Sequence, residues 1–171
     1  FESVPLGPNV DEAPPADGRP VWTKTPPEGW TLDDNGMPGM DDPELGVTEW
    51  KGWSFADRIW WATVAGDQRR SELWKGTGVA AVADPDEWDD KGNPAGVGTC
   101  NSVLISPEID VSNVPAEGLV LRFNSSWRPE GNQTATVTVA YDGAAEQEVL
   151  RWNATSDDKT NETVDLALNN P

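Results

Sequence analysis

The chain has 171 residues, which suits one domain with a sizeable core or one large β-sandwich and leaves little room for two independent domains. Its 30 acidic and 12 basic side chains give a formal net charge of −18. This charge excludes nucleic acid and anionic lipid as partners, because both require a basic face. It suits an extracellular or saline setting in which cations neutralise part of the self-repulsion, although solubility alone is another explanation.

Residues 5–45 are rich in proline, glycine and aspartate, as in "PLGPNVDEAPPADGRP". Long helices cannot run through such prolines, so this segment is predicted to be loop with short strands. The following stretch, "SFADRIWWATVAGDQRRSELW" at 54–74, is the one helical candidate. Its apolar spacing is mixed and Gly66 interrupts it, which predicts one or two helical turns around Ser54 to Ile59.

From Gly78 onward the sequence favours short strands separated by turn residues. The expected strands lie within 78–84, 101–107, 118–127, 134–143, the "EQEVLRWN" that follows a Tyr-Asp-Gly turn, and 161–168. In "NSVLISPEIDVS", Pro107 cannot donate to a strand ladder and is expected to end the pairing, with Ile109 and Val111 resuming an edge. Ser106 is then a turn residue. The pattern predicts an all-β protein, an antiparallel β-sandwich with long Pro/Gly/Asp-rich loops.

Catalysis finds little support in the sequence. The chain has no histidine, which removes Ser-His-Asp and Cys-His arrangements and the commonest general base. The single cysteine, Cys100, leads into an apolar run and reads as a small buried hydrophobe. A carboxylate pair for glycoside hydrolysis stays open in principle, but nothing marks one. We therefore expect a protein that is not an enzyme.

Several features favour an exported glycoprotein. Four N-x-S/T sequons occur in the last third, at Asn124, Asn132, Asn153 and Asn161. No signal peptide and no span of apolar residues long enough for a membrane is visible. The start at Phe1 without methionine suggests a processed or excised segment. An extracellular or cell-surface location follows as the expectation.

The order of several motifs resembles the cleaved-adhesin and "choice-of-anchor J" domains, relatives of the MAM-type jelly roll. "NSVLISPEIDVS" is similar to their "LxSPxIDLS" signature, and "FES" with the later "PPEGWTLDD" is similar to their opening. "GLVLRFNSSW", "TVTVAYDGAAEQEVLRW" and "NETVDLAL" resemble the strands that follow.

The resemblance implies a jelly-roll sandwich of the galactose-binding-like type over 1–171, with 5–45 as a loop-rich insertion. It implies a secreted adhesion or carbohydrate-binding module, often with structural calcium near the N-terminal strand, where Glu2 matches the family's glutamate. Relatives of this kind continue through two further strands, so the C-terminal strands are expected to be absent here. A neighbouring chain that supplies a strand would then complete the sandwich.

Tryptophan is the most unusual feature of the composition, with ten residues against one tyrosine and three phenylalanines. Tryptophan either fills a core or forms a platform that stacks on sugar rings. Trp60 and Trp61 are adjacent, and in a strand they would point to opposite faces, which places at least one near the surface. They are the first candidates for a sugar-binding site, followed by Trp50 and Trp53.

Two acidic loops are candidate cation sites, "LDDNGMPGMDD" at 32–42 and "ADPDEWDDKGN" at 83–93. Calcium takes six to eight oxygens from flexible loops of this kind, although neither loop has EF-hand spacing and a solvated acidic loop is the alternative. With Glu2, the candidate metal ligands are Asp33, Asp84 and Asp86.

Three functions remain open. The first is a non-catalytic extracellular adhesion module that binds a glycan or cell-surface partner and is stabilised by calcium. The second is a structural subunit of a filament or surface assembly, completed by strand exchange with a neighbour. The third is an accessory domain of a longer secreted hydrolase.

Overall fold

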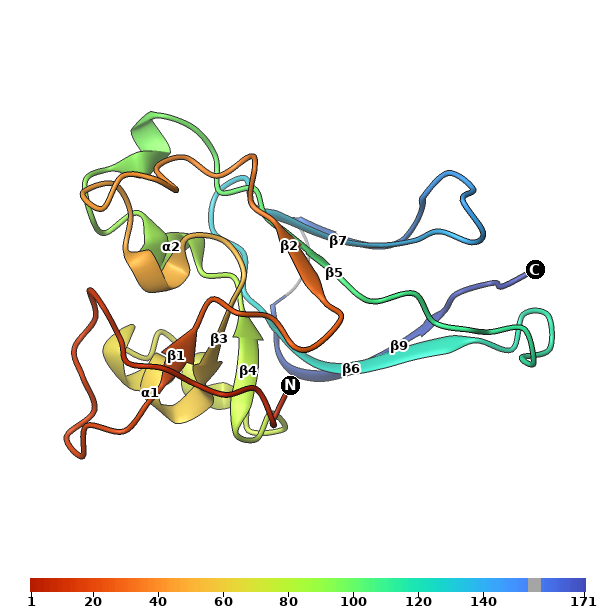
Figure 1. Ribbon diagram of the computed structural model, residues 1–171, viewed down its shortest axis with the longest axis horizontal. Coiled ribbons are helices and arrows are strands. Elements are labelled where there is room, and N and C mark those ends of the chain that lie inside the picture. The colour runs from red at the N-terminus through yellow and green to blue at the C-terminus, as the bar shows by residue number, and fades with distance from the viewer. Residues whose placement is uncertain (154–157) are drawn as a thin grey trace. The chain divides into compact units, whose positions relative to one another are not determined.

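The computed structural model describes residues 1–153 and 158–171 (Figure 1). The chain forms two compact units, and each is described by itself. Unit 1 comprises Phe1–Ser71 and Gly76–Glu108, and unit 2 comprises Glu72–Lys75 and Ile109–Pro171. None of the helices in these ranges is long and apolar enough to cross a membrane. One sandwich domain over 1–171 stays a prediction.

Unit 1 contains two small antiparallel sheets. The larger has the strand order β1–β3–β4, formed by Trp22–Thr23, Ser54–Asp57 and Val79–Val82. The smaller pairs β2 (Thr31–Asp33) with β5 (Val103–Ile105). These strands stay short because prolines and glycines flank them, and the expected end of pairing before Pro107 is confirmed. The expectation of short strands within residues 5–45 is confirmed by β1 and β2.

Two short α-helices complete unit 1. Helix α1 (Arg58–Val64) begins where the Asp57 carboxylate accepts a hydrogen bond from the Trp60 backbone N–H at 2.8 Å. It ends at Val64, and Gly66 beyond the C-cap Ala65 has a φ of 64°, which suits the left-handed position after a helix. Helix α2 (Pro85–Trp88) has Asp84 as its N-cap. The 3₁₀ turns η1, η2 and η3 span Thr48–Trp50, Arg70–Glu72 and Pro94–Gly96.

The predicted position of the helix was wrong. Ser54, Phe55 and Ala56 are buried in β3, the middle strand of the larger sheet, and the helix starts only after Asp57. Pairing on both edges outweighs the weak helical pattern of "SFAD". As a consequence Trp60 and Trp61 lie in a helix instead of a strand. Neighbouring helical residues are about 100° apart, so both rings fit on the buried side, and the expectation that one of them lies near the surface was wrong.

Unit 2 is built from two antiparallel ribbons of longer strands. Strand β6 (Val120–Trp127) pairs with β9 (Lys159–Ala167), and β7 (Thr134–Val139) pairs with β8 (Gln147–Asn153). The predicted β7–β8 hairpin is confirmed. Along β7 the threonines are exposed and the alanine and valines are half-buried, as their alternation predicted.

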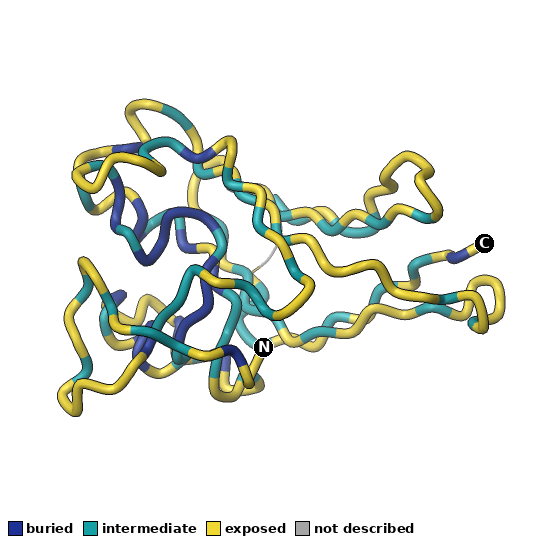
Figure 2. The backbone as a smooth tube through the Cα atoms, viewed as in Figure 1, coloured by how far each residue is buried: buried dark blue, intermediate teal, exposed yellow. Residues whose placement is uncertain are grey.

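The apolar side chains of unit 2 are only partly covered. Figure 2 shows the β6–β9 and β7–β8 strands as a mixture of intermediate and exposed residues, whereas the buried apolar residues of the described chain belong to unit 1, apart from Leu73. Trp127 and Trp152 pack together with ring centroids 6.0 Å apart. The edge expected at Ile109 and Val111 is wrong, because these residues belong to no strand and Ile109 is 71% exposed.

The chain is therefore mostly β with a few short helices, arranged in small antiparallel sheets. The finer assignment to a jelly-roll sandwich stays a prediction.

Candidate functional site

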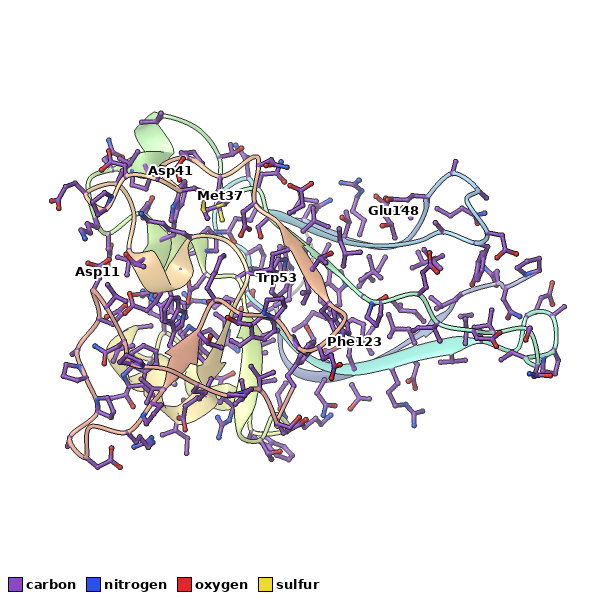
Figure 3. The ribbon with its side chains drawn as sticks, in the orientation of Figure 1. Asp11, Met37, Asp41, Trp53, Phe123 and Glu148 are labelled. Carbon is purple, nitrogen blue, oxygen red and sulfur yellow. The ribbon has the colours of Figure 1, made fainter. Side chains whose placement is uncertain are left out.

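The four tryptophans predicted to bind sugar all lie in unit 1. Trp50 is 0% exposed, Trp60 is 3% exposed and Trp61 is 9% exposed, whereas Trp53 is half-buried (labelled in Figure 3). The rings of Trp50 and Trp60 pack together with centroids 5.9 Å apart. A ring that stacks on a sugar needs a face open to solvent, so the platform has to be sought elsewhere.

The indole N–H groups of these buried rings tie them to neighbouring segments. Trp50 Nε1 donates to Glu12 Oε1 at 2.7 Å, and Trp60 Nε1 donates to the Ala13 carbonyl at 3.0 Å. Trp61 Nε1 donates to Asp84 Oδ2 at 2.8 Å. A buried indole is stabilised by such a partner. Trp50 and Trp60 therefore hold the proline-rich N-terminal segment, and Trp61 ties α1 to the N-cap of α2.

Glu49 anchors the same segment, a role that its sequence context did not reveal. Glu49 is 0% exposed, and its carboxylate accepts hydrogen bonds from the backbone N–H groups of Val10, Asp11 and Glu12. Three successive amides that converge on one carboxylate form an anion-binding nest. The nest is filled by the chain itself.

The four candidate metal ligands do not come together. In the described parts of the chain, no three histidine, cysteine or acidic side chains gather in a way that could hold a metal ion. Glu2 is exposed, and Asp33 Oδ1 accepts a hydrogen bond from the Asn35 backbone at 3.0 Å. Asp84 and Asp86 serve another partner. The arrangement of these four residues does not form a calcium site. Calcium binding by the protein stays a prediction that these residues do not support.

That partner is Arg70, which is 8% exposed. Its Nε and Nη2 donate to the two carboxylate oxygens of Asp84 at 2.8 and 3.0 Å, and it lies 3.0 Å from Glu87 and 3.4 Å from Asp86. Burial raises the pKa of Glu87 to about 7, although Arg70 lowers it and Asp84 raises it further. We call these four residues the Arg70 cluster. A guanidinium occupies the place that a cation would need.

Lysines play the same part in the other acidic loop, where Met37 and Asp41 are labelled in Figure 3. The Lys51 ammonium donates to the carbonyls of Gly39 and Asp42 at 2.9 and 2.6 Å, and Lys51 is 5% exposed. Lys24 Nζ lies 3.0 Å from Asp34 and donates to the Lys51 and Trp53 carbonyls. Backbone carbonyls of this kind are common calcium ligands, and here they bind ammonium groups.

The four sequons lie in unit 2 in different settings. Asn132 is exposed in the turn before β7, and Asn153 ends β8. The other two residues of the Asn153 sequon lie outside the described residues. Asn124 on β6 and Asn161 on β9 lie on adjacent strands and both contact Lys75. Whether any of them carries sugar stays a prediction.

The segment before Lys75 supplies the exposed tryptophan that the sequence analysis did not select. Trp74 is 69% exposed. The next residue, Lys75, is fixed to the β6–β9 ribbon: its backbone N–H donates to Asn161 Oδ1 at 2.9 Å, and its carbonyl accepts from Asn124 Nδ2 at 3.2 Å. Its ammonium donates to Thr163 at 3.3 Å, and Thr163 donates to Asn124 Oδ1 at 3.0 Å.

These five residues, which we call the Trp74 patch, combine one open aromatic face with amide and hydroxyl groups from two strands. Apolar or aromatic surface beside a few fixed polar groups is the usual composition of a small-molecule site. The "WKGTG" context was the available signal, because lysine and glycines around a tryptophan disfavour burial.

No protein-family model, no curated protein and no solved structure matches the chain. The resemblance to the cleaved-adhesin domains therefore stays an expectation that rests on the motifs alone.

Proposed function

We propose that this protein is a non-catalytic, extracellular surface-binding module that recognises carbohydrate through the Trp74 patch of unit 2. The observation that carries the proposal is the 69% exposure of the Trp74 side chain next to a segment fixed by hydrogen bonds to two strands. An indole that projects from an anchored backbone gives a rigid, flat surface for the C–H face of a sugar ring.

The flanking groups add the polar part of such a site. Asn124, Asn161 and Thr163 offer amide and hydroxyl groups next to Lys75. Hydrogen-bond donors and acceptors of both kinds suit hydroxyl groups of a saccharide. Calcium plays no part in the proposal, since Asp84 binds Arg70 and the carbonyls of Trp53 and Asp42 bind Lys24 and Lys51.

Affinity electrophoresis through gels that contain a soluble neutral polysaccharide, such as glucan, arabinoxylan or galactomannan, tests this proposal. We expect retardation by at least one polysaccharide, its loss in Trp74→Ala, and partial retention in Trp74→Phe, which keeps an aromatic face. Val97→Ala is the matched control, because Val97 is also exposed (71%) but lies in unit 1. Retardation that persists in Trp74→Ala, or its absence with every polysaccharide, contradicts the proposal.

A second function, a structural subunit of an extracellular assembly, is favoured by the edges of unit 2. Each ribbon in the described part of this unit has two strands only, which leaves backbone donors and acceptors along its outer edges. Such edges pair readily with a strand from another chain. We expect negative-stain electron microscopy of the natively isolated protein to show regular filaments if this is the function. Dispersed particles at all concentrations would rule it out.

A further inference from the structure

We propose that unit 1 carries a second ligand site, independent of the Trp74 patch, which binds a carboxylate-bearing saccharide such as a hexuronate. The site is a cavity of about 420 Å³ on the outer face of α1 and the turn that follows it. Its polar lining comes from Arg58, Thr63, Asp67 and Ser71, and its apolar lining includes Ile59. We call it the α1 pocket.

Arg58 supplies an uncommitted cation in an otherwise acidic protein. Its backbone is fixed by a hydrogen bond from its N–H to the Gly78 carbonyl at 3.0 Å. With respect to the residues that the structure describes, its guanidinium makes one hydrogen bond, from Nη1 to the Ser71 carbonyl at 3.5 Å. A guanidinium has five N–H donors in a planar fork that matches a carboxylate. Most of this donor capacity therefore faces the pocket or solvent.

The hydroxyl groups of the pocket have the opposite polarity. Thr63 Oγ1 donates its proton to the Ile59 carbonyl at 2.8 Å, and Ser71 Oγ donates to Asp67 Oδ2 at 2.9 Å. Because both protons are engaged within the protein, the two oxygens face a ligand as acceptors. The pKa of Asp67 is lowered, first by the Ser71 backbone N–H and then by its hydroxyl, so this carboxylate is also an acceptor. A matching ligand needs one anionic group and several O–H donors.

The shape of the pocket depends on an unusual backbone. Gly66, Asp67, Gln68 and Arg69 have φ angles of 64°, 62°, 37° and 72°, which is a run of four left-handed residues, three of them not glycine. Such conformations are strained for L-residues and concentrate at functional sites. The run turns the chain so that Asp67 and Ser71 line the same cavity as Arg58 and Thr63.

Ile59 completes the match to a sugar acid. It is 64% exposed on the pocket rim, where an isolated large apolar side chain offers contact area to the C–H face of a pyranose ring. A simple carboxylate such as acetate would use Arg58 alone. A neutral hexose would use the acceptors and Ile59 but leave the guanidinium without its anion. A hexuronate uses all three features together.

Isothermal titration calorimetry of the full chain with methyl galacturonoside, methyl galactoside and sodium acetate tests the proposal. We expect binding of the uronoside and at least about tenfold weaker binding of the other two ligands. The galactoside lacks the carboxylate that pairs with Arg58, and acetate has this carboxylate but none of the sugar hydroxyl groups. Arg58→Gln is expected to weaken uronoside binding by at least about tenfold. Arg19→Gln is the matched control, since Arg19 is an exposed arginine of unit 1 that pairs with Asp17.

Two more variants keep the test decisive. Thr63→Val keeps the shape of the pocket and removes one acceptor, and we expect about threefold weaker uronoside binding. Trp74→Ala is expected to leave uronoside binding unchanged, which separates this site from the proposed polysaccharide site. No heat of binding with the uronoside, equal binding of galactoside or acetate, or unchanged affinity in Arg58→Gln would each overturn the proposal.

Discussion

The two units of this chain achieve order by different means. Unit 1 has strands of two to four residues, yet it contains every buried apolar side chain of the described residues except Leu73, together with a set of buried charges that each have a partner. Unit 2 has strands of six to nine residues, yet none of the apolar side chains on these strands is buried. Regular secondary structure and a dry core are therefore separate properties. In this chain the less regular unit has the better-covered core.

A matched pair of phenylalanines gives the largest expected difference between the units. Phe55 in β3 is 0% exposed, whereas Phe123 in β6 (labelled in Figure 3) is half-buried. We expect Phe55→Ala to lower the free energy of unfolding by about 3–5 kcal/mol, and Phe123→Ala by about 1–2 kcal/mol, because the cost follows the buried area and the cavity. Urea denaturation followed by circular dichroism measures both. Equal losses would show that the β6 face is covered as completely as the core of unit 1.

The charged groups provide a second comparison. Arg70→Met leaves Asp84 and Glu87 buried without their cation, and we expect a loss of about 3 kcal/mol in the free energy of unfolding. Arg122→Met in unit 2 breaks the exposed pair with Asp165, and a much smaller loss is expected because solvent screens this pair. Thermal and urea unfolding of the two variants check this ranking. A loss below 1 kcal/mol for Arg70→Met would mean that the cluster is structurally dispensable.

The pH dependence of stability is expected to originate in unit 1. The folded pKa of Glu87, about 7, lies above its ordinary value, so the folded state binds this proton more tightly than the unfolded state. Its contribution is complete below about pH 4.5 and is lost as the pH rises to about 7, with an effect on the order of 1 kcal/mol. Glu87→Gln should flatten this part of the profile of urea midpoint against pH. An unchanged slope between pH 5 and 7 contradicts the assignment.

Asp11 provides the opposite sign within the same experiment. Burial alone would raise its pKa, but hydrogen bonds from Lys91 and Thr48 outweigh burial and lower the pKa to about 2. Its stabilising effect is present above about pH 4 and is lost as the pH falls toward 2. Asp11→Asn should therefore remove part of the acid-induced loss and leave the slope above pH 5 unchanged.

The smallest expected effect concerns reactivity, without a change in stability. Burial raises the pKa of the Cys100 thiol to about 11, and the positive charge of Lys24, which lowers this pKa, does not outweigh the effect of burial. Since the thiolate is the reactive form, labelling by Ellman's reagent at pH 8 should be at least about tenfold slower than that of Ser112→Cys, an exposed position in unit 2. Comparable rates would show that the Cys100 region opens readily.

Strand patterning made unit 2 largely predictable. The β6, β7, β8 and β9 strands follow from period-two alternation and turn residues, which are local signals. In unit 1 the position of α1 could not be read in this way. Ser54–Asp57 becomes a strand because β1 and β4 pair on its two sides, and those partners lie far away in the sequence.

The candidate sites were less predictable for a related reason. Tryptophan count and clustering do not distinguish a buried ring from an exposed one. The prediction for Trp60 and Trp61 assumed a strand, whereas both residues lie in helix α1. Acidic loops likewise show where carboxylates gather along the chain, but not that Arg70 or Lys51 reaches into them. Such long-range pairing decides whether an acidic loop is open to a metal.

The lysines that bind the acidic loop at 32–42 have a consequence for the conditions in which unit 1 stays folded. A metal bound at a loop is lost on dilution or to a chelator, whereas an ammonium group attached to the backbone keeps a fixed local concentration. Lys24 and Lys51 thus act as permanent internal counterions for Asp34 and the 39–42 turn. Unit 1 should therefore keep the same conformation in fresh water, in brine and in the presence of EDTA.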